Sequence, residues 1–155
     1  MKILTFTFYK DFARYFAYVE REAIKRFKEL EFVNHVIYPC AKRSFYKHGI
    51  NSEFVPYQLK ITKGIIRSQS IYYREYNLDE LIDFTVRALN VCDDTTKEKL
   101  KIRAVGYIDY YEELFSENSF SLVICSGDSR LPIEVCAAVA KKHQVKVWYF
   151  EQGPF

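Results

Sequence analysis

The turn Ser126-Gly127-Asp128-Ser129-Arg130 holds the residue types best suited to binding an anion. A helical pattern starts at Leu131, so free N–H groups and the positive end of a helix dipole would face a ligand here. Arg130 adds a guanidinium group, which can hold a carboxylate or phosphate through two parallel hydrogen bonds. The turn has neither P-loop nor GxGxxG spacing. The alternative, that Asp128 or Ser129 merely caps the helix, is left open.

The second candidate is Glu151-Gln152-Gly153-Pro154, which follows an apolar run. A carboxylate just past a buried strand can have a raised pKa, because burial disfavours its charged form, and such a group suits general acid–base work. Glu151 is therefore the candidate catalytic residue, and Gln152 and Gly153 are candidate substrate contacts. Spacing alone favours the plainer interpretation, a surface glutamate in a turn.

Both turns must be positioned by a strand–helix–strand unit. Two apolar runs, Ser121–Cys125 and Val145–Phe150, flank the helical pattern Leu131–His143, and this order is that of a βαβ unit. Continuous rather than alternating apolar sequence is typical of strands covered by helices on both faces. Each turn would then lie at the carboxyl edge of a parallel sheet, where ligands of open α/β sheets bind.

A second such unit opens the chain. Strands are predicted at Ile3–Phe8 and Phe32–Tyr38, with a helix between them that Asp11 can cap. Apolar residues spaced by three and four form one stripe on this helix, which we interpret as packing against the sheet. The stripe consists of Phe12, Phe16, Val19, Ala23, Phe27 and Leu30.

The middle of the chain is less regular. Residues 41–48 fit a short helix. It carries a basic cluster that is either a solvated face or a contact for an acidic sugar or phosphate, and the cluster consists of Lys42, Arg43, Lys47 and His48. Alternation at Tyr57, Leu59 and Ile61 suggests an edge strand or an extended excursion. Two more helices are indicated by the capping pairs Asn77 with Glu80 and Thr95 with Glu98.

Composition bounds the function classes. The chain has 155 residues, 49% hydrophobic and 28% charged, with a net charge of +3, so we expect one globular domain and no dedicated nucleic-acid binder. Four cysteines lack CxxC spacing; Cys125 and Cys136 are predicted to be buried, and no zinc site is expected.

No signal peptide and no membrane-spanning run is evident, which points to the cytoplasm. The last strand pattern is followed by few residues, so we interpret residues 1–155 as a single Rossmann-like domain, the N-terminal part of a longer two-domain protein.

The segments SGDSRLPIEVCAAVAKK and WYFEQGPF resemble the N-terminal half of bacterial capsular polysaccharide biosynthesis proteins, a group that includes the retaining β-Kdo glycosyltransferases. In that family a polar turn opens a helix, and the next, aromatic strand ends in a Glu followed by a Gly-containing turn. Ser126–Arg130, Trp148–Phe150, Glu151 and Gly153 occupy those positions. The resemblance is confined to the end of the chain, from Ser119 to Phe155.

The resemblance implies one half of a GT-B-like enzyme, with two Rossmann-like domains across a cleft. Such an enzyme would move an acidic sugar such as Kdo from a CMP-activated donor to a glycan or glycolipid acceptor of the capsule or lipopolysaccharide. Glu151 would act as acid/base or orient the acceptor, while Ser126, Asp128 and Arg130 would line the same cleft. No metal or other cofactor is implied. The location would be cytoplasmic, with peripheral association at the inner face of the membrane left open, and the chain without its missing C-terminal domain would be inactive.

A different class also fits the pattern. The chain could be a non-catalytic α/β module that binds a nucleotide or a protein. A receiver-like version is disfavoured, because the first strand ends in Phe8-Tyr9-Lys10-Asp11 without a pair of acidic residues.

Overall fold

A parallel β-sheet forms the centre of the molecule. The computed structural model describes residues 1–59, 70–127 and 130–150. Within them five strands pair in the order β3-β2-β1-β4-β5, and every pairing is parallel. The strands are β1 (Lys2–Thr7), β2 (Glu31–Val36), β3 (Glu53–Phe54), β4 (Phe120–Ser126) and β5 (Lys146–Phe150). The predicted α/β, Rossmann-like class is confirmed.

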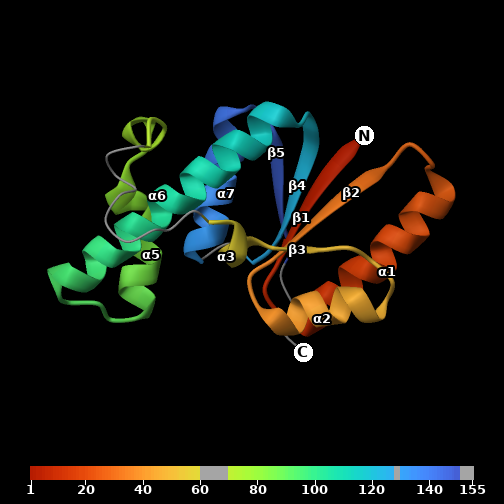
Figure 1. The fold of residues 1–155 in the computed structure, drawn as a ribbon, viewed down its shortest axis with the longest axis horizontal. Coiled ribbons are helices and arrows are strands. Elements are labelled where there is room, and N and C mark those ends of the chain that lie inside the picture. The colour runs from red at the N-terminus through yellow and green to blue at the C-terminus, as the bar shows by residue number, and fades with distance from the viewer. Residues whose placement is uncertain (60–69, 128–129, 151–155) are drawn as a thin grey trace.

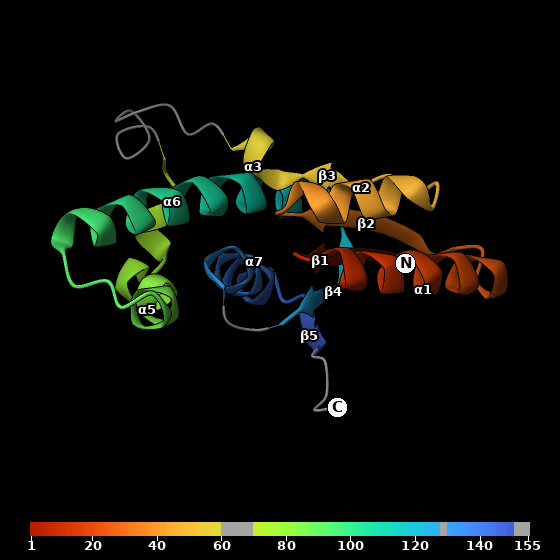
Figure 2. The ribbon, with the colours of Figure 1, turned by 90° about the horizontal axis from the view of Figure 1, so that it is seen from below.

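Helices cover both faces of this sheet (Figures 1 and 2). On one face lie α1 (Lys10–Arg26) and α2 (Pro39–Lys47); on the other lie α6 (Asp94–Glu117) and α7 (Leu131–Lys142), with α5 (Leu78–Ala88) against them. Two short elements, α3 (Val55–Gln58) and the 3-10 turn η1 (Tyr73–Glu75), lie between β3 and α5 in sequence.

The sheet separates two apolar cores. The larger joins Leu4, Phe6 and Phe8 to α5, α6 and α7, and the smaller joins Phe16 and Phe45 to the opposite face. Because β1 lies in the middle, its residues from Ile3 to Thr7 are all buried. This explains why a continuous apolar run, rather than an alternating one, encodes the strand.

Strand order sets where a ligand can reach the sheet. The chain passes from β1 through α1 to β2, which lies on one side of the β1–β4 pair. From β4 it passes through α7 to β5, which lies on the opposite side of that pair. The two connections therefore leave the adjacent strands in opposite directions and cover opposite faces. At such a switch point the loops diverge, leaving a crevice outside the carboxyl ends of the strands.

Helix starts differ from two of the predictions. Asn77 caps α5 as predicted, accepting a hydrogen bond from the Glu80 N–H at 3.3 Å. Thr95 does not cap α6; the helix begins at Asp94, and Asp93 accepts from the Thr96 N–H at 2.7 Å. Asp11 does not cap α1 either.

In α1 the N-cap position belongs to Tyr9, and Asp11, already inside the first turn, pairs with Arg14 at 3.7 Å. The other end is also shorter than predicted. The helix ends at Arg26, so the chain can reach β2 at Glu31, and Phe27 is left 54% exposed. Phe16 packs in the core as predicted, but Phe27 and Leu30 fall outside the helix.

Two strand predictions were wrong in part. Tyr57 lies in α3 rather than in a strand, since β3 is only Glu53–Phe54; Ile61 lies outside the described residues. The edge strand β5 is not covered on both faces, and Trp148 is 61% exposed. An apolar run indicates burial only where the topology supplies a second layer.

Cys125 and Cys136 are buried as predicted, and burial raises the pKa of the Cys125 thiol to about 12. Among residues 1–59, 70–127 and 130–150, no helix combines the length and the apolar character needed to cross a membrane.

Candidate functional site

The carboxyl ends of the central strands lie side by side. The Ser126 hydroxyl, on β4, donates to Thr7 Oγ1, on β1, at 3.3 Å, and both side chains are buried. The Gly127 N–H then donates to the carbonyl oxygen of Phe150, on β5, at 3.0 Å. Gly127 has φ +93, a left-handed conformation that a side chain would strain, although a Cβ there would meet no atom. Glycine is therefore favoured here by the backbone conformation of the turn and not by lack of space for a side chain.

Arg130 reaches across this edge to the loop after β1. Its guanidinium donates to the Tyr9 hydroxyl and, at 3.4 Å, to the Tyr38 hydroxyl. The guanidinium carbon lies 5.0 Å from the ring centre of Phe8 and 5.2 Å from that of Tyr9, within the range of cation–π attraction. We call Phe8, Tyr9, Tyr38 and Arg130 the arginine corner.

Three helices begin at the arginine corner. Tyr9, Tyr38 and Arg130 are the N-cap residues of α1, α2 and α7, and none of the three side chains caps its own helix. Because these side chains contact one another, the three helix N-termini lie close together. Each brings free N–H groups and the positive end of its dipole, so the corner favours a negatively charged ligand.

Arg130 gives the corner a positive charge. Arg130 is exposed, and in the described part of the chain its partners are neutral phenol rings and hydroxyls rather than carboxylates. A planar guanidinium that hydrogen bonds already orient can bind an anion with little further loss of side-chain conformational freedom. Its chemistry is that of binding phosphate or carboxylate.

Three of the predicted site residues lie at this edge of the sheet: Ser126 and Gly127 where β4 ends, and Arg130 where α7 begins. Asp128, Ser129, Glu151, Gln152 and Gly153 lie outside the described residues. The N-cap position of α7 belongs to Arg130, whose side chain makes no capping hydrogen bond.

Sequence reasoning missed the aromatic half of the corner. In the sequence Phe8 and Tyr38 are the last residues of predicted strands, and Tyr9 directly follows Phe8. The signal was present, because each lies at or just past the carboxyl end of a predicted strand. At a switch point those positions face a ligand whatever their residue type.

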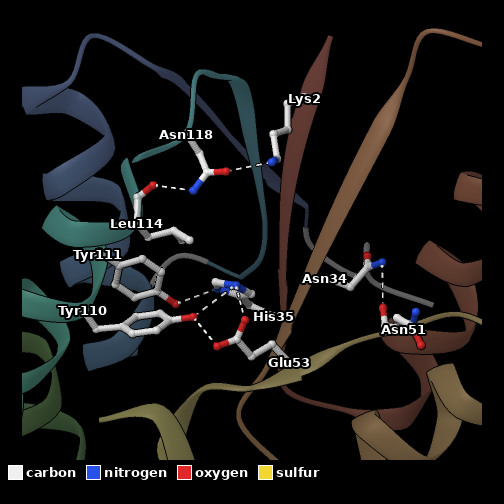
Figure 3. A network of polar contacts seen from close by, with 9 residues as sticks. All are labelled: Lys2, Asn34, His35, Asn51, Glu53, Tyr110, Tyr111, Leu114 and Asn118. Atoms are coloured by element: carbon white, nitrogen blue, oxygen red, sulfur yellow. Dashed lines mark hydrogen bonds and ion pairs between the residues drawn. The ribbon is translucent and has the colours of Figure 1, made fainter. Parts of the chain in front are cut away.

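A second polar cluster joins β2, β3 and α6 (Figure 3). His35 is fully buried, with Nε2 3.4 Å from the Tyr110 hydroxyl and Nδ1 3.4 Å from the Tyr111 hydroxyl. Tyr110 donates to a Glu53 oxygen at 2.8 Å, so it can only accept from His35. The proton therefore belongs on Nε2, and Nδ1 accepts from Tyr111.

Burial lowers the pKa of His35 to about 3, so the imidazole is neutral at pH 7. Its 3.7 Å approach to Glu53 is then not a charged pair. The cluster fastens the sheet to α6, and none of its residues belongs to the arginine corner.

No family model and no curated protein sequence matches the chain. The fold is similar to that of UDP-GlcNAc 2-epimerase from Neisseria meningitidis bound to UDP-GlcNAc, with TM-score 0.59 and 14% identity over 99% of this chain and 33% of that one. A second UDP-N-acetylglucosamine 2-epimerase gives TM-score 0.56, 16% identity and coverage of 99% and 34%. A putative UDP-N-acetylglucosamine 2-epimerase from Listeria monocytogenes gives TM-score 0.54, 11% identity and coverage of 96% and 29%.

The chain thus spans about a third of the length of these solved structures. At such low identity the similarity shows the shared Rossmann-like fold.

Proposed function

We propose that this chain is the Rossmann-like part of an enzyme that acts on a nucleotide sugar, and that the arginine corner binds the anionic group of that substrate. The observation that carries the proposal is Arg130, held by Tyr9 and Tyr38 where three helices begin. The fold similarity to UDP-GlcNAc 2-epimerases, one of them bound to UDP-GlcNAc, supports the substrate class.

Within that class we propose glycosyl transfer. An acidic sugar such as Kdo would pass from a CMP-activated donor to a surface-polysaccharide or glycolipid acceptor, as the resemblance of residues 119–155 implies. Overall, the bond between the anomeric carbon and the phosphate oxygen would break and CMP would leave as an anion, while that carbon bonds to the acceptor oxygen and the acceptor's proton passes to a base such as Glu151. Arg130 and the helix N-termini would stabilise that charge without a metal.

The other predicted residues take roles in the same proposal. Glu151 would be the acid/base, or would orient the acceptor, and Asp128, Ser129, Gln152 and Gly153 would contact substrate beside Ser126 and Gly127. A second domain would supply the remaining donor contacts. The enzyme would work in the cytoplasm, at the inner face of the membrane when its acceptor is a glycolipid.

Epimerisation is the second candidate reaction, and the similarity to UDP-GlcNAc 2-epimerases favours it. A non-catalytic module that binds a nucleotide or a protein is the third. The transferase would bind CMP, and the epimerase would bind UDP-GlcNAc. The module would bind no nucleotide, or would bind one without turnover.

Calorimetric titration of the chain with CMP, UDP and UDP-GlcNAc tests the proposal. We expect binding that Arg130→Gln weakens by about 10-fold or more, the effect of losing one charge-assisted hydrogen bond. Arg87→Gln is the matched control, because Arg87 is also exposed but lies on α5 and pairs with Asp83 at 2.7 Å. The proposal fails if no nucleotide binds at millimolar concentration, or if Arg130→Gln binds as tightly as the control.

A further inference from the structure

A hollow of about 290 Å³ lies beside α2, and none of its lining residues belongs to the arginine corner. It is lined by Pro39, Lys42, Arg43, Tyr46, Phe54 and Tyr57. The basic cluster predicted on this helix divides here: Lys42 and Arg43 line the hollow, whereas Lys47 and His48 do not.

The sequence places these side chains outward. Ala41 and Phe45 are fully buried against the sheet and hold α2 in place. Lys42, Arg43 and Tyr46 therefore occupy the outer face of the same helix, and Tyr46 is 81% exposed.

The floor and far wall come from β3 and α3. Phe54 packs into the smaller core, and the Tyr57 ring meets it edge-on with 4.6 Å between ring centres. Tyr57 is itself 83% exposed, so its ring is positioned by one neighbour and otherwise open to a ligand. The hollow thus has two exposed aromatic rings fixed to two different elements.

The hollow also carries charge of one sign. Lys42 and Arg43 are exposed, and neither makes an ion pair with any other residue in ranges 1–59, 70–127 and 130–150. Two adjacent cations beside two open aromatic rings match a ligand that has both a ring and a negative charge. The ring would stack on tyrosine, and the charge would meet Lys42 and Arg43.

We propose that this hollow binds a single-ring anion, a sugar ring carrying a carboxylate or a phosphate. The size argues for one ring, because about 290 Å³ lies at the lower limit of small-molecule pockets. The inference does not rest on the proposed function, since it uses none of the arginine corner residues. Tyr38 of the corner and Pro39 of the hollow are neighbours in sequence, so the two ligands would occupy adjoining parts of one face.

Calorimetric or ligand-detected NMR titration of the chain with glucuronate, glucose 6-phosphate and glucose tests it. We expect at least one of the two anions to bind about 10-fold or more tightly than glucose, and which anion binds decides between carboxylate and phosphate. Lys42→Gln with Arg43→Gln, and separately Tyr46→Ala, should each weaken binding of that anion by about 10-fold. We expect these variants to fold normally, because all three positions are exposed.

Matched controls lie on the same face of the sheet. Lys47→Gln removes a cation from α2, and Tyr18→Ala removes a 64% exposed tyrosine from α1; neither lines the hollow, and both should bind normally. Arg130→Gln should also bind normally, which separates this site from the corner. Equal binding of glucose, equal loss in the controls, or no binding of either anion at about 10 mM would each overturn the inference.

Discussion

The arginine corner depends on individual side chains more than on sequence motifs. Arg130 could be proposed from the sequence because an arginine before a predicted helix has an evident use. Its partners Tyr9 and Tyr38 could not, because tyrosine is as common in cores as in sites and their contacts join residues about 90 or more positions apart. For the same reason the sequence does not predict the contacts among His35, Glu53 and Tyr110, since only the folded chain brings them together.

At Glu151 the proposal is tested by separating catalysis from folding. In the complete enzyme Glu151→Gln should slow sugar transfer by about 100-fold or more, because a positioned acid/base is lost. The melting temperature should stay close to that of the unmodified protein, since the amide is similar in size. Initial rates and thermal melts measured together check this, and rapid transfer by the folded variant would remove Glu151 from the mechanism.

His35 predicts a pH dependence of stability. Its folded-state pKa is about 3 against an ordinary value of 6.5, so below pH 6.5 the unfolded chain binds a proton that the folded chain does not. The contribution of the neutral histidine is complete above pH 6.5 and is lost as pH falls towards 3. Denaturant unfolding of the unmodified chain and of His35→Gln should therefore differ in slope by about 1.4 kcal/mol per pH unit over this range.

Equal slopes for the two proteins between pH 6.5 and 3 would contradict the burial of a neutral His35. The comparison of slopes tolerates a loss of overall stability in the variant, because a constant difference leaves the slope unchanged.

At the scale of elements, local patterns located nearly every strand and helix but not all of their ends. The βαβ units at Lys2–Val36 and Phe120–Phe150 followed from apolar runs and helical spacing. The stretch after β3 did not, because Pro56 and the packing of Val55 into the core favour a short helix where alternation suggested a strand. The register and the order β3-β2-β1-β4-β5 depend on tertiary pairing, which no local pattern records.

Helix caps provide a test of the corrected boundaries. Asp93→Ala should lower the melting temperature, because the Thr96 N–H loses its acceptor at the start of α6. Thr95→Ala, which removes the residue that the sequence pattern favoured, should change it little. Asn77→Ala should destabilise the chain by about 1 kcal/mol through the equivalent loss at α5. Thermal melts of the three variants suffice, and a larger effect at Thr95 than at Asp93 would restore the original boundary.

At the scale of the whole molecule, one edge of the sheet is aromatic and open. Trp148, Tyr149 and Phe150 on β5 are 61%, 49% and 38% exposed, and Phe150 stacks on Tyr15 with 4.9 Å between ring centres. Apolar groups gathered on an edge strand favour association, because the strand offers both surface and unpaired backbone groups.

Self-association of the chain should consequently rise with concentration. Trp148→Lys should reduce it by placing a charge on the edge, whereas Leu89→Lys, at a 66% exposed apolar position after α5, should have little effect. Sedimentation velocity over a range of concentrations measures this. A chain that stays monomeric throughout, or that responds equally to both variants, would show that the β5 edge is not an association surface.

The most direct test of the central claim is to map nucleotide binding on the chain itself by amide NMR. On addition of CMP, UDP or UDP-GlcNAc, the account predicts that the largest shifts fall on Tyr9, Tyr38, Gly127 and Arg130, where β1, β2 and β4 end. It also predicts that Arg130→Gln needs about 10-fold more nucleotide, or higher, to reach the same shifts, and that Arg87→Gln titrates like the unmodified chain. Shifts centred elsewhere on the sheet, or none at saturating nucleotide, would contradict a nucleotide-sugar site at the arginine corner.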